Sequence, residues 1–475
     1  MAKNKDGKTM SRFEHSLRVN CVKVIDLILV TAAFALCWYF YYADEILTPY
    51  YFKGNLLIIF LFSVIFFFMS RVYDGFKISI YRISEVISSQ MLGVMITDGI
   101  IYLIICAMAR RMVNILPGCL CLAVQIIIIS LWAFFAHKWY FSVFSPQKSL
   151  VIYDIREGMD DLINEYGLSK KFDVKKSIHI SEFDKSMLDE YDTVFLGGVH
   201  SRDRNRILKQ CVECEKTLYI IPRIGDVLMS GADGIHMFHL PMLRAERCNP
   251  QAPYLFIKRI ADIVISLVGL VITSPIMLIT AIAIKTDGGP VFYKQERLTK
   301  DGKVFKILKF RSMRVDAEKD GVARLSTGEN DDRITKVGRI IRKCRIDELP
   351  QLINILIGEM SVVGPRPERP EIAAEYEKSL PEFKLRLQVK AGLTGYAQVF
   401  GKYNTTPYDK LVMDLMYINH LGIMNDMRVL LGTVKILFQK ESTEGVDPGQ
   451  VTALDYENEA NRTEKWEKRD EHWED

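Results

Sequence analysis

The sequence has no strong excess of charge of one sign, no regular cysteine framework and no complete metal-ligand motif. Its net charge is only +4 over 475 residues, so the composition does not indicate a nucleic-acid partner. The nine cysteines are scattered, several of them within apolar runs, which argues against the disulfide framework of a small secreted domain. Cys211 and Cys214 form a lone CxxC, and His236 and His239 lack a third ligand nearby, so neither pair predicts a metal site.

Long apolar runs, in contrast, are abundant. The chain is 49% hydrophobic and 25% charged, which predicts membrane and cytoplasmic parts in one protein. A polar, basic N-terminal segment, residues 1–20, precedes the first apolar run. This run is longer than a signal-peptide core and has no small-residue cleavage site, so we predict a retained anchor. Four runs approach the length that crosses about 30 Å of hydrocarbon and predict a four-helix transmembrane domain at 21–145: residues 22–42, 56–72, 91–108 and 120–141.

The basic residues between these runs predict the orientation of the membrane domain. Lys77 and Arg82 lie between the second and third runs, and Lys138 and Lys148 lie at or after the end of the fourth. The basic residues at 110 and 111 favour the opposite orientation of the membrane domain, but they are fewer. We therefore expect the N-terminus and the region after the fourth run to face the cytoplasm.

Residues 146–245 alternate between short apolar strands and amphipathic helices. We expect strands at 149–153, 193–196 and 218–222 and helices at 158–166 and 202–214. This pattern predicts a Rossmann-like α/β domain. The segment after the first strand, residues 154–158, lacks the G-x-G-x-x-G fingerprint, so we expect a structural or regulatory module that does not bind NAD.

A fifth apolar run, residues 260–284, allows two interpretations. Hydropathy alone favours an ordinary fifth crossing. Ser274 and Pro275 in its middle allow a different path, because proline removes a helical hydrogen bond and bends the helix, and the serine hydroxyl can satisfy a freed carbonyl. Lys258, Arg259 and Lys285 flank both ends and would then lie at one headgroup surface.

The stretch from Gly338 to Glu368 places two adjacent carboxylates, Asp347 and Glu348, among basic residues. The apolar stripe at 349, 352, 353 and 356 predicts a helix, with Asp347 at its N-cap. An isolated aspartate at such a position is ordinarily a capping residue. The alternative is a nucleophile that attacks a phosphoryl group, with Glu348 holding a divalent cation.

Ordered motifs from Lys258 to about Leu437 extend this stretch. They are Lys258-Arg259 with Asp262, Ser274-Pro275, and the segments 289–297, 309–313, 316–318, 335–339, 347–351, 360–367 and 393–395, with Ala397 and Gln398. These motifs resemble the bacterial sugar transferase family of monotopic polyprenyl-phosphate sugar-1-phosphate transferases. The four-helix N-terminal domain is similar to that of the long members. Under this resemblance, residues 255–286 are expected to form a re-entrant membrane helix-break-helix and residues 287–440 a mixed α/β membrane-associated catalytic domain.

The resemblance implies transfer of a sugar 1-phosphate, with galactose or glucose favoured, from a UDP-sugar to undecaprenyl phosphate. The products would be UMP and a diphosphate-linked lipid that starts capsule, exopolysaccharide or O-antigen synthesis at the cytoplasmic face of the bacterial inner membrane. Asp347 would be the nucleophile of a ping-pong mechanism and Glu348 a Mg²⁺ ligand. We expect the phosphates to be bound by residues of the same motifs: Arg366, Arg342, Arg339, Gln295, Arg297, Lys309 and Arg311.

Several positions depart from the family pattern. Thr299 and Ala391 stand where glycine and proline are usual, and Arg345 where a small polar residue is common. These departures leave the carboxylates and Arg366 intact. A catalytically inactive scaffold of a polysaccharide assembly complex is the alternative function, and dimerisation through the membrane and α/β domains is a further hypothesis. Residues 441–475 are dense in charge and predict a solvated tail.

Overall fold

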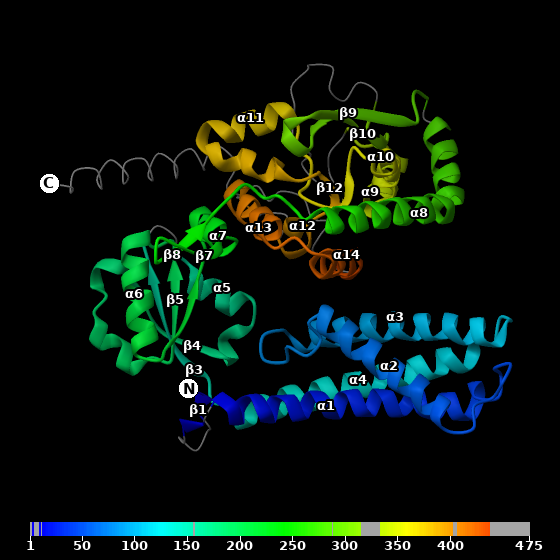
Figure 1. Cartoon of the computed structure of the whole chain (residues 1–475), viewed down its shortest axis with the longest axis horizontal. Helices are drawn as coiled ribbons and strands as arrows, with labels where there is room; N and C mark the ends of the chain where they lie inside the picture. Colours follow the sequence, from blue (N-terminus) through cyan, green and yellow to red (C-terminus); the bar gives the residue numbers. More distant parts are fainter. Residues whose placement is uncertain are drawn as a thin grey trace. The chain divides into compact units, whose positions relative to one another are not determined.

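The computed structural model describes residues 2–3, 9–10, 12–154, 157–286, 288–314, 333–401 and 406–437. The predicted charged tail at 441–475 and the motif residues 316–318 lie outside the described residues. By its internal contacts the chain divides into two units, Met1–Ile221 and Pro222–Asp475. Each unit is described by itself (Figure 1).

The first unit begins with a short antiparallel ladder of β1 (Ala2–Lys3) and β2 (Thr9–Met10), followed by four long helices. These helices confirm the four predicted apolar segments: α1 (Arg12–Cys37, continued by a π-helical turn at Trp38–Tyr42), α2 (Lys53–Val72), α3 (Ile83–Ala109) and α4 (Leu116–Val143). The helices pack through aromatic residues, with the rings of Phe34 and Phe62 stacked 4.2 Å apart. Their outer faces are also apolar, as at Leu103 and Ile127. Helices that are apolar on all sides suit a membrane, and each is long enough to cross one.

A four-stranded parallel sheet follows, in the order β4-β3-β5-β6. Its strands are β3 (Gln147–Tyr153), β4 (Phe172–His179), β5 (Thr193–Gly197) and β6 (Thr217–Ile220). Helix α5 (Met159–Glu165) covers one face through Ile163, and α6 (Ser201–Glu213) covers the other through Ile207 and Cys211 (Figure 1). Short 3-10 turns lie at Leu168–Lys170, Ile180–Glu182 and Lys185–Glu190.

The sheet confirms the three predicted strands and both predicted helices. The sequence analysis missed β4, because its middle residues are polar and exposed, including Lys175 and Lys176. Cys211 of the lone CxxC is buried in the core. The description of this sheet as Rossmann-like stays a prediction.

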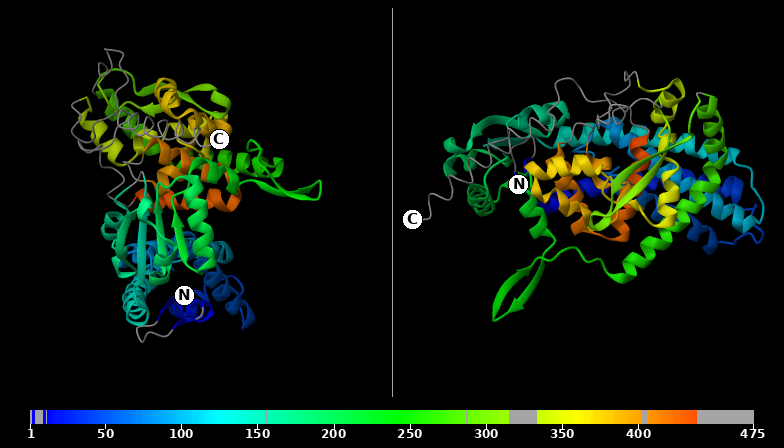
Figure 2. Two further views of the ribbon diagram at one scale, coloured as in Figure 1. Left: turned by 90° about the vertical axis from the view of Figure 1, so that its left-hand side faces the viewer. Right: turned by 90° about the horizontal axis from the view of Figure 1, so that it is seen from above.

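The second unit starts with α7 (Ile224–Ser230), whose Ile224 and Val227 join its core. A hairpin of β7 (Asp233–Met237) and β8 (Leu240–Arg244) follows and extends away from the rest of its unit (Figure 2). The division of the chain at Ile221 therefore places residues 222–245 with the second unit.

Helix α8 (Ala252–Thr286) corresponds to the fifth apolar run and contains Pro275. Its two limbs meet at an angle (Figures 1 and 2). Pro275 has no N–H for the carbonyl of Val271, and the Ser274 hydroxyl donates to that carbonyl at 2.8 Å. The serine thus performs the predicted role at the break. Because α8 is also long enough to span a membrane, the re-entrant path stays a prediction.

The rest of the second unit surrounds two pairs of strands. The strands are β9 (Phe292–Leu298) antiparallel to β10 (Val304–Phe310), joined through a 3-10 turn at Lys300–Gly302, and β11 (Ser361–Val363) parallel to β12 (Gly392–Thr394). The helices are α9 (Lys336–Lys343), α10 (Gln351–Ile357), α11 (Pro370–Ser379), α12 (Tyr396–Phe400), α13 (Pro407–Asn419) and α14 (Ile423–Leu437), with 3-10 helices at Ile346–Glu348 and Pro381–Gln388. Met360, Leu411 and Leu415 are fully buried at the centre of the core. Gly364 and Gly392 let two backbone segments touch, since a Cβ on Gly392 would lie 2.1 Å from the Gly364 nitrogen.

Candidate active site

The two adjacent carboxylates lie in a 3-10 turn between α9 and α10. Arg345, with a left-handed φ of 56°, turns the chain into this segment, Ile346–Glu348. Helix α10 begins only at Gln351, after Pro350, and has no side-chain N-cap. The predicted N-cap role of Asp347 is therefore wrong: the helix starts later, and the Asp347 carboxylate does not cap it.

Asp347 is partly buried, and one of its two carboxylate oxygens is inaccessible to solvent. Among the residues that the structure describes, its Oδ1 has no hydrogen-bond partner. Burial and the negative charge of Glu348 raise the pKa of Asp347, while Lys309 and two arginines oppose this shift. A buried oxygen without a partner is costly in a protein that uses it only for stability. The position therefore suits an atom that reacts with, or binds, a ligand.

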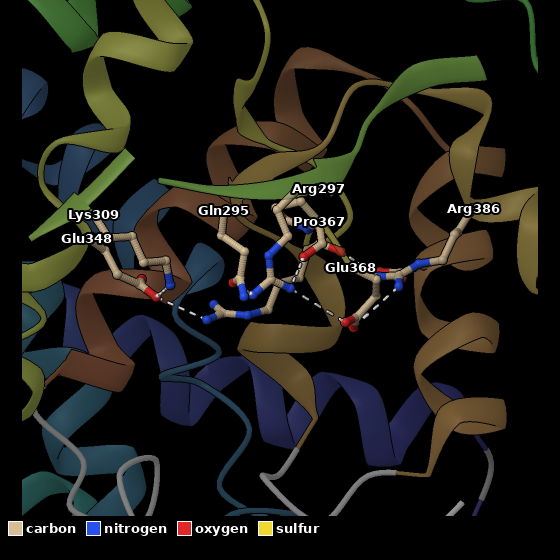
Figure 3. Close-up of polar contacts among 9 residues, drawn as sticks. Gln295, Arg297, Lys309, Glu348, Pro367, Glu368 and Arg386 are labelled. Carbon is tan, nitrogen blue, oxygen red and sulfur yellow. Dashed lines mark hydrogen bonds and ion pairs between the residues drawn. The ribbon is translucent and has the colours of Figure 1, made fainter. Parts of the chain in front are cut away.

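Glu348 is compensated by cations from two other segments (Figure 3). Its Oε1 accepts hydrogen bonds from Lys309 Nζ of β10 at 3.2 Å and from Arg366 Nη2, beyond β11, at 3.0 Å. Its side chain is 14% exposed. Burial alone would raise the pKa of Glu348, but Lys309, Arg366 and Arg345 together hold it well below its usual range. Glu348 is therefore ionised at neutral pH.

The pKa values of Lys309 and Arg366 shift in opposite directions at this site. Burial lowers the pKa of Lys309, although Glu348 acts in the opposite direction. The negative charge of Glu348 raises the pKa of Arg366. The Arg366 side chain is 42% exposed, so it lies at the edge of the site where an anionic ligand can reach it.

The backbone of the Pro-Arg-Pro loop is held by two arginines, one buried and one partly buried (Figure 3). Arg386 Nη2 donates to the Arg366 carbonyl at 2.9 Å, and Arg297 Nη1 donates to the Pro367 carbonyl at 3.1 Å. Glu368 lies between them, 3.5 Å from Arg386 and 4.0 Å from Arg297. These contacts fix the loop that carries Arg366.

Arg386 is fixed in turn by Asp414 of α13. Their side chains, 4% and 1% exposed, approach to 2.7 Å. Sequence analysis missed both residues because they lie 28 positions apart in different helices. Arg386 is close to the motif at Gly392–Thr394, which was the only local signal for it.

Comparison with known proteins shows that most of the second unit matches one protein family. Residues 253–440 match the family model described as bacterial sugar transferase. The chain is 43% identical over 194 residues to the galactosyl transferase CpsE of Streptococcus agalactiae, covering 39% of this chain and 42% of that protein. It is 35% identical over 236 residues to the UDP-N-acetylgalactosamine-undecaprenyl-phosphate N-acetylgalactosaminephosphotransferase of Aeromonas hydrophila, covering 49% and 55%.

A third match covers nearly the whole of a shorter relative. The exopolysaccharide production protein PSS of Rhizobium leguminosarum bv. phaseoli is 43% identical over 190 residues, which are 38% of this chain and 94% of that protein. The chain belongs to the bacterial sugar transferase family. The matched regions span about half the length of the first two relatives, and the family model lies within the second unit, from α8 onward.

In this bacterial sugar transferase the residues predicted to bind phosphate fall into three groups. Lys309 and Arg366 meet at Glu348. Gln295 accepts a hydrogen bond from Arg297 at 2.7 Å, and burial lowers the pKa of Arg297 to about 10. This pair lies beside the Pro-Arg-Pro loop, which it supports (Figure 3).

The third group lies just after β10 and on α9. Arg311 is buried and donates to the carbonyl of Ile284 at 3.3 Å and to that of Gly288, at the end of α8. Arg342 donates to the Ser312 hydroxyl at 2.9 Å, and Arg339 is exposed. Arg311 thus holds α8, and phosphate-binding roles for Arg342 and Arg339 stay predictions.

The donor set of the transferase site is limited for a metal ion. No group of three or more histidine, cysteine, aspartate or glutamate residues is arranged around a metal position within the described ranges. Asp347 and Glu348 supply two carboxylates, and both cations contact the same oxygen of Glu348, Oε1. Mg²⁺ is commonly held by one or two carboxylates together with water and substrate phosphates. The residues present therefore fit Mg²⁺ that is shared with a phosphate ligand.

Proposed function

We propose that this protein transfers a sugar 1-phosphate from a UDP-sugar to undecaprenyl phosphate at the cytoplasmic face of the bacterial inner membrane. The product would start capsular polysaccharide, exopolysaccharide or O-antigen synthesis. Family membership supports the proposal, as do the names of relatives such as the Aeromonas hydrophila protein. The observation that carries it is the buried, unpartnered Asp347 oxygen beside the cation-bound Glu348.

The arrangement suggests a reaction in two displacements. In the first, an Asp347 oxygen attacks the β-phosphorus of the UDP-sugar, the bond from this phosphorus to the bridging oxygen breaks, and UMP leaves with the electron pair. In the second, an oxygen of the lipid phosphate attacks the same phosphorus and the Asp347 carboxylate leaves. Covalent catalysis of this kind lets one site accept the soluble and the lipid substrates in turn.

The cations near Asp347 would solve the problem of charge repulsion. A carboxylate nucleophile and a diphosphate repel each other unless positive groups lie beside the oxygens that carry the charge. Lys309 and the half-exposed Arg366 are such groups. Bound Mg²⁺, with Glu348 as a ligand, would neutralise further phosphate charge.

The donor sugar is an open part of the proposal. The names of the relatives include galactose, glucose and N-acetylgalactosamine, so similarity alone does not select one sugar. Galactose and glucose are our first candidates.

The test is UMP release by the purified protein with Mg²⁺ and undecaprenyl phosphate, across a panel of UDP-hexoses and UDP-N-acetylhexosamines. We expect release with one donor that depends on the lipid. Asp347→Asn should lower kcat by at least about 10³-fold and abolish covalent labelling, since it removes the nucleophile. Glu348→Gln should lower kcat by about 10²–10³-fold. Lys378→Arg, an exposed change on α11, is the control and should leave the rate unchanged.

Two outcomes would contradict the proposal. Wild-type rates in Asp347→Asn would remove it as the nucleophile. No UMP release with any donor, with lipid and folded protein verified, would favour the alternative of an inactive scaffold.

A further inference from the structure

Helix α8 buries polar residues in spite of its apolar composition. The side chains of this 35-residue helix that are described as buried are Asp262, Ser266, Thr280 and Ile284. Asp262 is only 5% exposed. A carboxylate buried on an apolar helix is costly unless specific donors compensate it, so its partners show what it does.

The partners of Asp262 are in β11. Its Oδ1 accepts hydrogen bonds from the Val362 backbone nitrogen at 2.9 Å and from the Ser361 hydroxyl at 3.1 Å. Strand β11 has only three residues and pairs with β12 through Ser361 and Val363. Asp262 therefore satisfies the remaining amide of a short strand that leads directly into Gly364, Pro365 and Arg366.

Two further contacts connect α8 to the other charged elements of the site. Arg259 donates to the carbonyls of Ile355 and Leu356 at 2.7 and 2.8 Å, at the end of α10, the helix that follows Glu348. Arg311, which follows Lys309 in the chain, donates to carbonyls at the other end of α8. Each of the three segments that carry Lys309, Glu348 and Arg366 is thus tied to the membrane helix by a polar contact.

We propose that Asp262 is a positioning residue that holds Arg366 against Glu348 through β11, so that α8 sets the phosphate-binding groups at a fixed depth relative to the bilayer. This inference rests on the proposed transferase function for its kinetic consequences. A lipid phosphate lies at the headgroup level and cannot be moved to the protein, so the protein must place its cations at that level. A displacement of about 1 Å in such groups can lower a rate about 10²-fold.

The test compares Asp262→Ala, Asp262→Asn and Ser361→Ala in the full-length protein in lipid nanodiscs. Alanine at 262 leaves the Val362 N–H without an acceptor, so we expect kcat to fall about 10- to 100-fold. Asparagine keeps an acceptor oxygen and should restore most of the rate. Ser361→Ala removes one of the two bonds and should give a smaller loss, which keeps the test informative if Asp262→Ala does not fold. Thr273→Val is the matched control, because the Thr273 hydroxyl donates hydrogen bonds to Gly269 and Met277 of α8 itself.

A double-mutant cycle tests whether Asp262 acts through Arg366. In an Arg366→Lys background, Asp262→Ala should cost less than in the wild type, because the group that it positions is already altered. An equal cost in both backgrounds, or a wild-type rate in Asp262→Ala, would overturn the proposal.

Hydrogen exchange gives a readout that does not require activity. Asp262→Ala should speed amide exchange across residues 361–366, whereas Thr273→Val should leave it unchanged. A wild-type protein that releases no UMP would refute the proposed function alone, and the exchange result would still decide the positioning role. Unchanged exchange in Asp262→Ala would refute that role.

Discussion

Asp347 and Glu348 are neighbours in the chain, yet their surroundings shift their pKa values in opposite directions. Burial and the charge of Glu348 raise the pKa of Asp347. Glu348 is also buried, but Lys309 and Arg366 on its Oε1 lower its pKa. Two carboxylates with divergent pKa values suit two different tasks. Here Glu348 is held as an anion by its two cations, whereas burial disfavours the charged form of Asp347 in spite of Lys309 and two nearby arginines.

This contrast predicts opposite effects of two isosteric substitutions on stability. Asp347→Asn should stabilise the protein at neutral pH by on the order of 1 kcal/mol, because it removes a carboxylate whose charged form is disfavoured by burial and by the charge of Glu348. Glu348→Gln should destabilise it by about 1–3 kcal/mol, because it weakens hydrogen bonds to two cations. Thermal unfolding of both variants in the same detergent measures the difference. A loss of stability in Asp347→Asn would contradict this account of Asp347.

The pH dependence of the stability difference follows from the sign of the Asp347 shift. With a raised folded pKa, native Asp347 holds its proton at a pH where unfolded Asp347 has lost it. The wild type is therefore closest to Asp347→Asn in stability at acid pH. The wild type should become less stable than Asp347→Asn as the pH rises from the ordinary aspartate pKa through the raised pKa of Asp347.

The pH profile of activity should have two limbs, one set by the protonation of Asp347 and the other by the protonation of Lys309. The rate should rise with pH as Asp347 loses its proton, at a pH above the ordinary aspartate value. It should fall again when Lys309 loses its proton, at a pH below the ordinary lysine value, since burial lowers the pKa of Lys309. Lys309→Arg should move the alkaline limb to higher pH, because guanidinium keeps its charge. An alkaline limb that is the same in wild type, Lys309→Arg and the Lys378→Arg control would exclude Lys309 as its cause.

At the scale of elements, two departures from the family pattern meet in space. The Thr299 hydroxyl, after β9, donates to the Glu359 carbonyl at 3.0 Å and accepts from the Ala391 nitrogen at 3.2 Å. The resemblance described in the sequence analysis leads us to expect glycine and proline at positions 299 and 391. Proline has no N–H, so a partner at 299 is unnecessary there. Alanine at position 391 has a buried N–H that needs an acceptor, and the Thr299 hydroxyl is that acceptor.

This pair predicts a coupled effect on stability. Thr299→Val should cost about 1–3 kcal/mol, because it leaves the buried Ala391 N–H and the Glu359 carbonyl unsatisfied. In an Ala391→Pro background the same substitution should cost less, since the N–H is gone. Unfolding of the two single variants and the double variant gives the coupling energy. Additive costs would show that the two departures are independent.

At the scale of the whole molecule, five helices in the described part of the chain are long and apolar enough to cross a membrane. Four of them pack together around buried aromatic residues. The fifth, α8, contains Pro275 and has two limbs that meet at an angle (Figure 1), and it exposes apolar side chains such as Val271 and Ile279. A bent apolar helix can enter and leave by one leaflet, which would keep the second unit on the side of the membrane where the proposed UDP-sugar is found.

Single cysteines in a cysteine-free variant would test this path. We expect cysteines at Gln251 and Lys285, on either side of α8, to react with an impermeant maleimide in inverted vesicles but not in intact spheroplasts. A cysteine at Met112, in the predicted external loop between α3 and α4, should show the reverse pattern. Labelling of Gln251 and Lys285 from opposite sides would establish a full crossing.

The sequence by itself determined the elements whose signal is local. The apolar runs specified the long helices because a helix satisfies its own backbone hydrogen bonds, whatever lies elsewhere in the chain. The hydrogen bond from the Ser274 hydroxyl to the Val271 carbonyl was also predictable, since both partners lie within one helical turn. The motifs around Asp347, Glu348 and Arg366 identified the carboxylates and the arginine in the same way.

Only the tertiary structure decided which distant residues meet. Glu348 lies 39 positions from Lys309 and 18 from Arg366, and Asp262 lies 100 positions from Val362. Local periodicity carries no information about such pairs, because their distance depends on how strands and helices pack. The same limit explains the incorrect N-cap prediction for Asp347 and the missed roles of Arg386 and Asp414. Asp347 is a candidate nucleophile because its Oδ1 is buried and has no hydrogen-bond partner within the described residues. No sequence pattern records such an unsatisfied atom.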